Sequence, residues 1–394
     1  MSNATPIRYR LAETTIDQTD LEDLCAWLKT NPWLTQGPLV KEFEHGWANW
    51  IGLPHACFVN SGSSANLLMY YALIVGERLA NQKVVVPAVS WVTSVAPAIQ
   101  LGLEPLMCEA DPDTFGLDPN HLERLCQEHK PAMVLLVHVL GVPCKMDEIL
   151  ALQEKYRFIL IEDTCAAMGS RYQGKLVGTF GTMASFSLYF GHHASTMEGG
   201  MVVTQDDDLR DLLFMLRSHG WTKDLSPEKQ YSYAEDFDIP VFNRAFTFYL
   251  PGFNCRATDL QARLGLGQLK KIEHAFQRRR ENHRKYQELI GNSEHFQCQH
   301  NPKAEICSIS FMALAKDSEH RTRVGAALKE AGIETRPVGG GNMSRQPFWR
   351  KRYGVQTFPM ADRLHDAAFQ LPNHPDLSLH DIETICSVVL GVRT

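Results

Sequence analysis

The chain has 394 residues, of which 44% are hydrophobic and 21% charged, the balance of an ordinary globular protein with one large and one smaller domain. Its 39 basic and 45 acidic residues give a formal net charge of −6 at pH 7, so we expect no nucleic-acid partner. The first residues lack the apolar core of a secretory signal, and the longest apolar stretch, near residues 133–142, is too short to span a bilayer.

The ten cysteines are scattered along the chain and form none of the CxxC or CxC pairs of zinc ribbons and compact iron–sulfur sites. We therefore expect reduced, mostly buried thiols, no bound metal, no membrane partner and a cytoplasmic location. The consecutive Arg278, Arg279 and Arg280 are interpreted as the solvated face of a helix.

Hydrophobic periodicity predicts the first elements. Apolar residues at helical spacing predict a helix over 21–28, and Gly37 with Pro38 breaks the chain before a second helix. Strand-like runs at 83–87, 133–137 and 158–163 alternate with helical segments such as 147–156. This alternation predicts an α/β fold with a mainly parallel sheet, helices on both faces, and ligands at the carboxyl ends of the strands.

The pattern changes after residue 259. A long helix is predicted over 260–286, a strand over 306–311 and another helix over 321–331. We place a large domain over residues 1–264 and a small C-terminal α+β domain over 265–394. The N-terminal segment is a candidate member of the small domain.

The first candidate site lies at residues 60–66, Asn-Ser-Gly-Ser-Ser-Ala-Asn, before a helix-forming run. A Gly/Ser turn that opens a helix exposes backbone N–H groups, so Gly62, Ser63 and Ser64 form a candidate anion cradle. The alternative is an ordinary helix start with Ser63 or Ser64 as the capping residue.

Two further candidates follow predicted strands. Trp91, after the strand at 83–87, is expected either to stack on a flat cofactor ring or to lie in the core. Asp163 ends the apolar strand at 158–161, where a carboxylate is costly to bury unless it is paired. It is expected either to face a protonated ring nitrogen or to cap the next helix.

Residues 186–200 contain Ser187 and then the adjacent His192 and His193 before a glycine-rich turn. Neighbouring histidines point apart, so they are not a metal pair on one helix face. One of them is expected to have a supporting or solvent-facing role.

Taken in order, these segments resemble the DegT/DnrJ/EryC1/StrS family of pyridoxal phosphate (PLP) enzymes that modify sugars. The resemblance covers nearly the whole chain, from Trp33 to Pro337, and includes residues 218–222, Ser-His-Gly-Trp-Thr, and 250–256, Leu-Pro-Gly-Phe-Asn-Cys-Arg. It implies PLP fold type I (aspartate aminotransferase-like) and a homodimer with active sites shared between subunits. Its fold would contain a large domain with a mainly parallel mixed sheet and a small α+β domain.

The same resemblance implies roles for individual residues. The cofactor would be held by Gly62, Ser63, Ser64, Trp91, Asp163, Ser187 and, from the other subunit, Asn254. In this arrangement the serines and the asparagine hold the phosphate, the indole stacks on the ring, and the carboxylate pairs with the pyridine nitrogen. Contacts with glutamate or the sugar nucleotide would come from His219, Arg256 and Arg336.

In this family a lysine after the Ser-containing strand forms a Schiff base with PLP. Here His192 stands at that position, and no lysine lies between Lys175 and Lys223. A histidine there resembles the sugar 3-dehydratases of the family, in which it would act as acid and base on pyridoxamine phosphate (PMP). The resemblance implies glutamate-using 3-dehydration of a nucleotide-linked 4-keto-6-deoxyhexose, with GDP-4-keto-6-deoxy-D-mannose as expected substrate. Colitose, a lipopolysaccharide O-antigen sugar, is the expected end product.

Two alternatives remain. One is a nucleotide-sugar aminotransferase in which Lys223 reaches the cofactor, and the other is a non-catalytic binding or regulatory protein with the same fold. One residue departs from the family pattern, since Ala166 stands where relatives often carry Gln or Glu near the ring hydroxyl. The segment 224–243 is expected to cover the site and to influence substrate choice.

Overall fold

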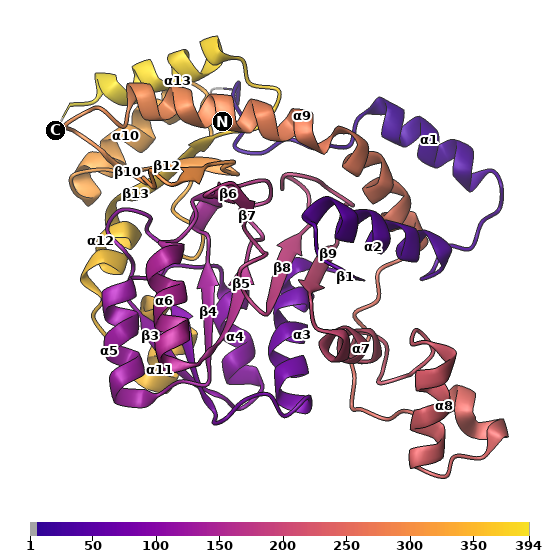
Figure 1. The fold of residues 1–394 in the computed structure, drawn as a ribbon. Helices are drawn as coiled ribbons and strands as arrows, with labels where there is room; N and C mark the ends of the chain where they lie inside the picture. The colour runs from indigo at the N-terminus through magenta and orange to yellow at the C-terminus, as the bar shows by residue number, and fades with distance from the viewer. Residues whose placement is uncertain (1–5, 394) are drawn as a thin grey trace.

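A seven-stranded sheet is the largest sheet of the computed structural model, which describes residues 6–393 (Figure 1). Strand β9 runs antiparallel to its neighbours β1 and β8, and the remaining pairs are parallel. The prediction of an α/β fold with a mainly parallel sheet is therefore confirmed. In spatial order the strands are β1 (His55–Val59), β9 (Gly200–Thr204), β8 (Met183–Ser187), β5 (Ile159–Asp163), β4 (Met133–Val137), β2 (Lys83–Pro87) and β3 (Glu104–Cys108).

Helices cover both faces of this sheet, as the alternating pattern predicted (Figure 1). One layer contains α3 (Gly62–Val75), α4 (Val92–Gln100) and α7 (Asp207–Leu216). The other contains α2 (Pro38–Ile51), α5 (Pro119–His129), α6 (Met146–Tyr156) and the first half of α9 (Asp259–Leu289). Two apolar layers therefore sandwich the strands.

The C-terminal part builds a second sheet with the order β10 (Gln297–Cys298), β12 (Ser310–Leu314) and β13 (Ala368–Pro372). Its helices are α10 (Ser318–Glu330), α11 (Pro347–Tyr353), α12 (Pro359–Ala367) and α13 (Leu379–Gly391), with the short η3 (Met343–Arg345) before α11. The N-terminal segment joins this part, because the amides of Arg8 and Tyr9 donate to the Gly332 carbonyl. A small third sheet contains β6 (Arg171–Tyr172), β7 (Lys175–Leu176) and β11 (Ala304–Glu305).

Helix α9 passes without interruption through the proposed domain boundary at 264/265 and packs on α2 and on α13. The division into domains 1–264 and 265–394 stays a proposal. The remaining elements of this half are α1 (Gln18–Leu28), which packs on α9, and the arm formed by α8 (Pro227–Asp236) and η2 (Val241–Phe246). The arm projects from the body beside α7 (Figure 1).

Two sequence predictions about this half were wrong. Arg279 is buried rather than solvated, and its guanidinium donates to the carbonyls of Ile309 and Asn373. The strand expected from residue 306 begins at Ser310. Residues 306–309 are instead a linker, because the Cys307 and Ile309 amides donate to the Ser170 hydroxyl and the Leu140 carbonyl rather than to a neighbouring strand.

All ten cysteines are free thiols, and eight of them are buried, as expected. Among residues 6–393, no helix is both long and apolar enough to cross a membrane.

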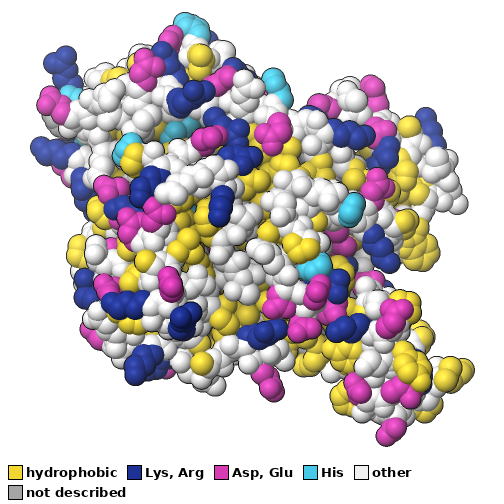
Figure 2. All heavy atoms as spheres, in the orientation of Figure 1, with side chains coloured by type: hydrophobic (Ala, Val, Ile, Leu, Met, Phe, Trp, Pro, Cys, Tyr) yellow, Lys and Arg dark blue, Asp and Glu magenta, His cyan; other side chains and the backbone are white. Residues whose placement is uncertain are grey.

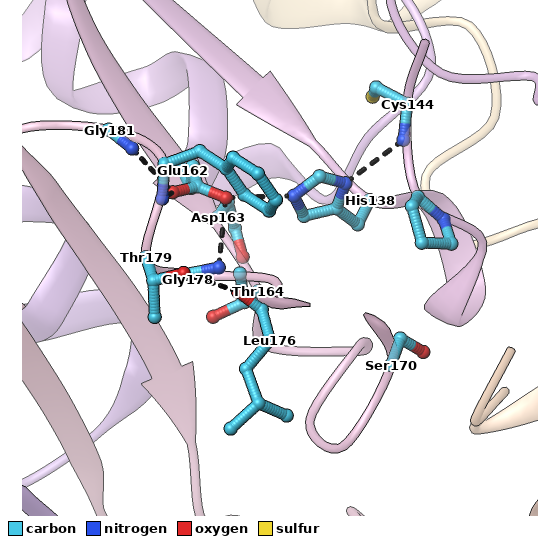
Figure 3. Close-up of polar contacts among 12 residues, drawn as sticks. His138, Cys144, Glu162, Asp163, Thr164, Ser170, Leu176, Gly178, Thr179 and Gly181 are labelled. Carbon is cyan, nitrogen blue, oxygen red and sulfur yellow. Dashed lines mark hydrogen bonds and ion pairs between the residues drawn. The ribbon is translucent and has the colours of Figure 1, made fainter. Parts of the chain in front are cut away.

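A buried carboxylate fixes the end of β5. Glu162 accepts hydrogen bonds from the amides of Gly178, Phe180 and Gly181 and from Nε2 of His138, 3.1 Å away (Figure 3). The other ring nitrogen of His138, Nδ1, accepts from the amide of Cys144, which follows η1 (Val139–Gly141). Four donors therefore compensate the desolvation of one carboxylate and attach two loops to the strand.

His283 of α9 predicts how stability depends on pH. Its Nδ1 lies 2.8 Å from the Ser308 hydroxyl, and burial lowers its pKa to about 3, against about 6.5 for an exposed histidine. Between these pH values the unfolded chain binds a proton that the folded chain excludes. Stability contributed by the neutral ring is therefore complete above pH 6.5 and is lost as the pH falls, by about 1.4 kcal/mol per pH unit for one proton.

We expect His283→Gln to flatten this dependence by up to one proton. The measurement is urea unfolding at intervals from pH 7.5 to pH 5. An unchanged slope in the variant would show that His283 titrates normally in the folded protein.

Candidate active site

Four parallel strands end at one edge of the central sheet, and the predicted site residues gather there. Asp163 ends β5 and pairs in register with Val137 at the end of β4. Ser187 ends β8, and Trp91 follows β2 at the start of α4. This edge is where ligands bind in open α/β sheets.

Asp163 is buried and accepts three hydrogen bonds. Its Oδ2 accepts from Nδ2 of Asn66 (2.8 Å) and from the Ser94 hydroxyl (2.7 Å), and its Oδ1 accepts from the Cys165 amide (3.0 Å). The alternative of a helix cap is wrong, because a turn and β6 follow rather than a helix. Asn66 and Ser94, on α3 and α4, orient the carboxylate, and sequence reasoning missed both because nothing in the sequence pairs them with β5.

The candidate anion cradle is the start of α3. The helix begins at Gly62, and the capping residue is Ser61, whose hydroxyl accepts from the Ser64 amide, so the alternative with Ser63 or Ser64 as the cap is wrong. Ser63 is exposed, and the first amides of a helix have no intrahelical partner. A Cβ on Gly62 would lie 2.7 Å from Cβ of Ser187, so only glycine allows this close approach.

Trp91 is 60% exposed, which rules out the core interpretation and leaves its indole available to a ligand. It precedes α4 as the N-cap residue without a side-chain cap bond. The same helix carries Ser94, so the indole and one partner of Asp163 stand three residues apart.

One ring nitrogen of His192, Nδ1, forms a hydrogen bond, and Nε2 forms none within residues 6–393. Nδ1 lies 2.7 Å from the Cys165 carbonyl oxygen, and because a carbonyl only accepts, Nδ1 carries the hydrogen. In the neutral ring Nε2 then carries the lone pair of a base. Burial is the main cause that lowers the pKa of His192 to about 4, opposed by the bond to Cys165 and reinforced by the charges of Arg279 and Arg336.

The candidate substrate residues fall into two groups. Arg336 is exposed and near enough for its charge to lower the pKa of His192, and its Nε donates to Gln370. Arg256 pairs with Val59 in a β-bridge at the end of β1 and donates to the Ser218 hydroxyl. His219 and Asn254 flank this second group, and Asn254 is exposed.

Lys223, the residue on which the aminotransferase alternative depends, lies with the second group. Its Nζ is 4.9 Å from the centre of the Trp221 ring, and the charges of Arg256 and Arg217 help burial to lower its pKa. The side chain is exposed. Ala166 offers no polar side chain to a ring hydroxyl.

This geometry fits a flat, anionic, pyridine-type cofactor. Gly62 and Ser187 approach closely at the start of α3, where the first helix amides are a suitable site for a phosphate. The buried Asp163 carboxylate accepts three hydrogen bonds and keeps acceptor capacity for a protonated ring nitrogen. Among residues 6–393 no cluster of three or more His, Cys, Asp or Glu side chains could hold a metal ion.

Fold and site together define a PLP fold type I enzyme, aspartate aminotransferase-like. The model of the DegT/DnrJ/EryC1/StrS aminotransferase family matches residues 14–390, and the chain belongs to this family.

Three relatives are similar over most of their length. GDP-4-keto-6-deoxy-D-mannose 3-dehydratase of Yersinia pseudotuberculosis is 36% identical over 341 residues, which cover 85% of this chain and 86% of that protein. The E. coli enzyme of the same name, solved with bound hydrated PLP, superposes with a TM-score of 0.89 at 30% identity, covering 98% of this chain and 100% of that one. Another solved structure, of a GDP-4-keto-6-deoxymannose 3-dehydratase with a trapped PLP–glutamate geminal diamine, gives a TM-score of 0.88 at 30% identity, over 97% of this chain and 100% of that one.

The low pKa of His192 can be measured in the cofactor-free protein. We expect its ring resonances, assigned by comparison with His192→Asn, to titrate near about pH 4, because burial disfavours the charged ring. Arg336→Gln should move the midpoint upward, since it removes a positive charge that acts on the ring. A midpoint at or above 6.5 in the unmodified protein would contradict the structure.

Proposed function

We propose that this protein catalyses the 3-dehydration of a nucleotide-linked 4-keto-6-deoxyhexose, with PLP/PMP as cofactor and glutamate as amine donor. GDP-4-keto-6-deoxy-D-mannose is the proposed substrate, and colitose synthesis for lipopolysaccharide O-antigen, in the cytoplasm, is the proposed context. The names of the relatives support the reaction and the GDP group.

One observation carries the proposal: at the position of the family lysine, the chain has His192, whose Nδ1 hydrogen is fixed on the Cys165 carbonyl. An imidazole cannot become a neutral imine, so this residue does not hold the cofactor covalently. Its Nε2 is instead unprotonated at neutral pH, because burial lowers the pKa of His192 to about 4, and is therefore available as a base.

The cofactor, when bound, would supply an amine that condenses with the 4-keto group and a ring that serves as an electron sink. The α3 amides with Ser63, Ser64 and Ser187 would hold its phosphate, and Trp91 would cover its ring. Asp163 would keep the ring nitrogen protonated, because Asn66 and Ser94 hold the carboxylate in place.

His192 would then perform both proton transfers. Nε2 would remove a proton from the cofactor carbon that bears the amine, and the resulting imidazolium would donate a proton to the C3 hydroxyl, which would leave as water. Arg336, whose charge reaches His192, is the proposed contact for a carboxylate or a phosphate on the same side. His219 and Arg256 are the proposed contacts on the other side.

The decisive experiment is an assay of GDP-, CDP- and TDP-4-keto-6-deoxyhexoses with glutamate. We expect release of ammonia and 2-oxoglutarate, fastest with the GDP sugar, and loss of turnover in His192→Asn. His192→Lys should give a borohydride-fixed pyridoxyl-lysine at residue 192 while dehydration collapses, since an amine with pKa near 10.4 is a poor proton shuttle at neutral pH.

Two results would contradict the proposal. A pyridoxyl-lysine at Lys223 in the unmodified protein, with an amino sugar as product, would establish the aminotransferase alternative. Tight binding of sugar nucleotides without release of ammonia would establish the non-catalytic alternative.

We also propose that the enzyme is a homodimer with shared sites. The arm exposes an apolar set that one protomer does not cover (Figure 2), with Phe242 exposed to 95%; the set comprises Phe237, Val241, Phe242, Phe246 and Phe248. Such an area favours burial against a second copy. Asn254 is exposed beside the base of the arm, where a partner's phosphate cradle could be completed.

We expect Asn254→Ala to weaken PMP retention on gel filtration without changing thermal stability. Asn292→Ala is the matched control, because Asn292 is also exposed but donates to the Glu288 carbonyl at the far end of α9. A protein that is monomeric by sedimentation yet keeps its cofactor and its full rate of dehydration would contradict the shared site.

A further inference from the structure

His193, the neighbour of the proposed base, has no role in the chemistry derived above, yet it is buried. Its Nε2 lies 2.8 Å from the Cys307 carbonyl oxygen, so Nε2 carries the hydrogen and donates it. The ring meets Phe276 edge-on, with 6.0 Å between ring centres. Nδ1 has no protein partner within the described chain, and the residue lines a cavity of about 190 Å³ beside α9.

The carbonyl that receives this bond is itself held rigidly. The Ser170 hydroxyl accepts from the Cys307 amide (2.9 Å) and donates to the Gly141 carbonyl (2.6 Å). Gly141, with φ +105°, approaches so closely that a Cβ there would lie 2.6 Å from Cα of Ser308. The linker at 306–309 is therefore a fixed anchor on the large domain; Ser170 and the adjoining loop are drawn in Figure 3.

Two consecutive rings thus donate to two carbonyls from different parts of the chain. His192 donates to Cys165, after β5, and His193 donates to Cys307, at the entry to the small domain. Both histidines lie in the turn between β8 and β9, which also contains Gly191 at φ +80° and Met197 at φ +70°. Backbone of this kind keeps its shape only when its surroundings fix it.

We propose that His193 is a positioning residue for the reaction assigned above: its bond to Cys307 keeps the catalytic turn in the orientation that directs His192 Nδ1 to Cys165 and leaves Nε2 as the base. The proposal rests on the proposed function for its kinetic consequence only, since the tautomer of His192 can be observed without any reaction.

The test compares two substitutions at this position. The side-chain amide of His193→Gln reaches the place of Nε2 and can still donate to Cys307, whereas His193→Phe fills the volume without a donor. In His193→Phe we expect kcat to fall about 10- to 100-fold, the size found for lost supporting contacts at metal sites, while KM changes less than about threefold. His193→Gln should recover most of the loss.

A second readout uses the cofactor-free protein labelled with ¹⁵N-histidine. The unmodified protein should show His192 as the Nδ1–H tautomer, and His193→Phe should show a mixture of tautomers. His320→Phe is the matched control, because buried His320 also donates to a backbone carbonyl, that of Val392 (3.0 Å), but in the small domain. It should leave the signal of His192 unchanged.

Two outcomes would overturn the proposal: an unchanged His192 tautomer and kcat in His193→Phe, or a His193→Gln variant as inactive as His193→Phe. If His193→Phe does not fold, Ser170→Ala loosens the same carbonyl from the other side and should lower kcat in the same way, and no effect there overturns the proposal too. If the unmodified protein shows no dehydratase activity, the proposed function fails while the tautomer measurement still decides the role of His193.

Discussion

A single turn after β5 joins the two halves of the site. The Asp163 carboxylate is buried, so it has to find hydrogen-bond donors, and one of them is the amide of Cys165 two residues later. The carbonyl of that same residue receives the hydrogen of His192 Nδ1. Asp163, which would polarise a cofactor ring, and His192, which would move the proton, are therefore both hydrogen-bonded to the backbone of Cys165. A shift of this turn would misplace both side chains.

The architecture was predictable from local patterns. Alternating strands and amphipathic helices predicted the mainly parallel sheet, and the end of the strand at 158–163 indicated Asp163, whereas Ser187 came from the family resemblance. The family resemblance also indicated His192, because this residue stands at the position of the family's Schiff-base lysine. The partners Asn66 and Ser94 could not be predicted, because each is an ordinary polar residue on a helix whose contact with Asp163 exists only after three elements pack.

The errors have a common physical cause. Arg279 in a run of three arginines, and the linker at 306–309, were read from local composition, which favours a solvated helix face and a strand. In the folded chain, buried carbonyls before β12 and after β13 need donors, and the Arg279 guanidinium supplies them to Ile309 and Asn373. The burial of Arg279 depends on carbonyls far away in the sequence, so local composition cannot predict it.

The amides of Gly178, Phe180 and Gly181, which surround Glu162, also fix the position of Asp163. Consecutive side chains of a strand point to opposite faces, so Glu162 and Asp163 face different helix layers. A slip of β5 by one residue would turn both carboxylates to the opposite face, taking Glu162 away from the amides of Gly178 and Gly181 and Asp163 away from Asn66. Only in the present register does the Glu162 carboxylate accept its four hydrogen bonds, so a misaligned β5 would lose these donors for a buried charge. Transfer of this site into another sheet would therefore require Glu162 and its donors together with Asp163.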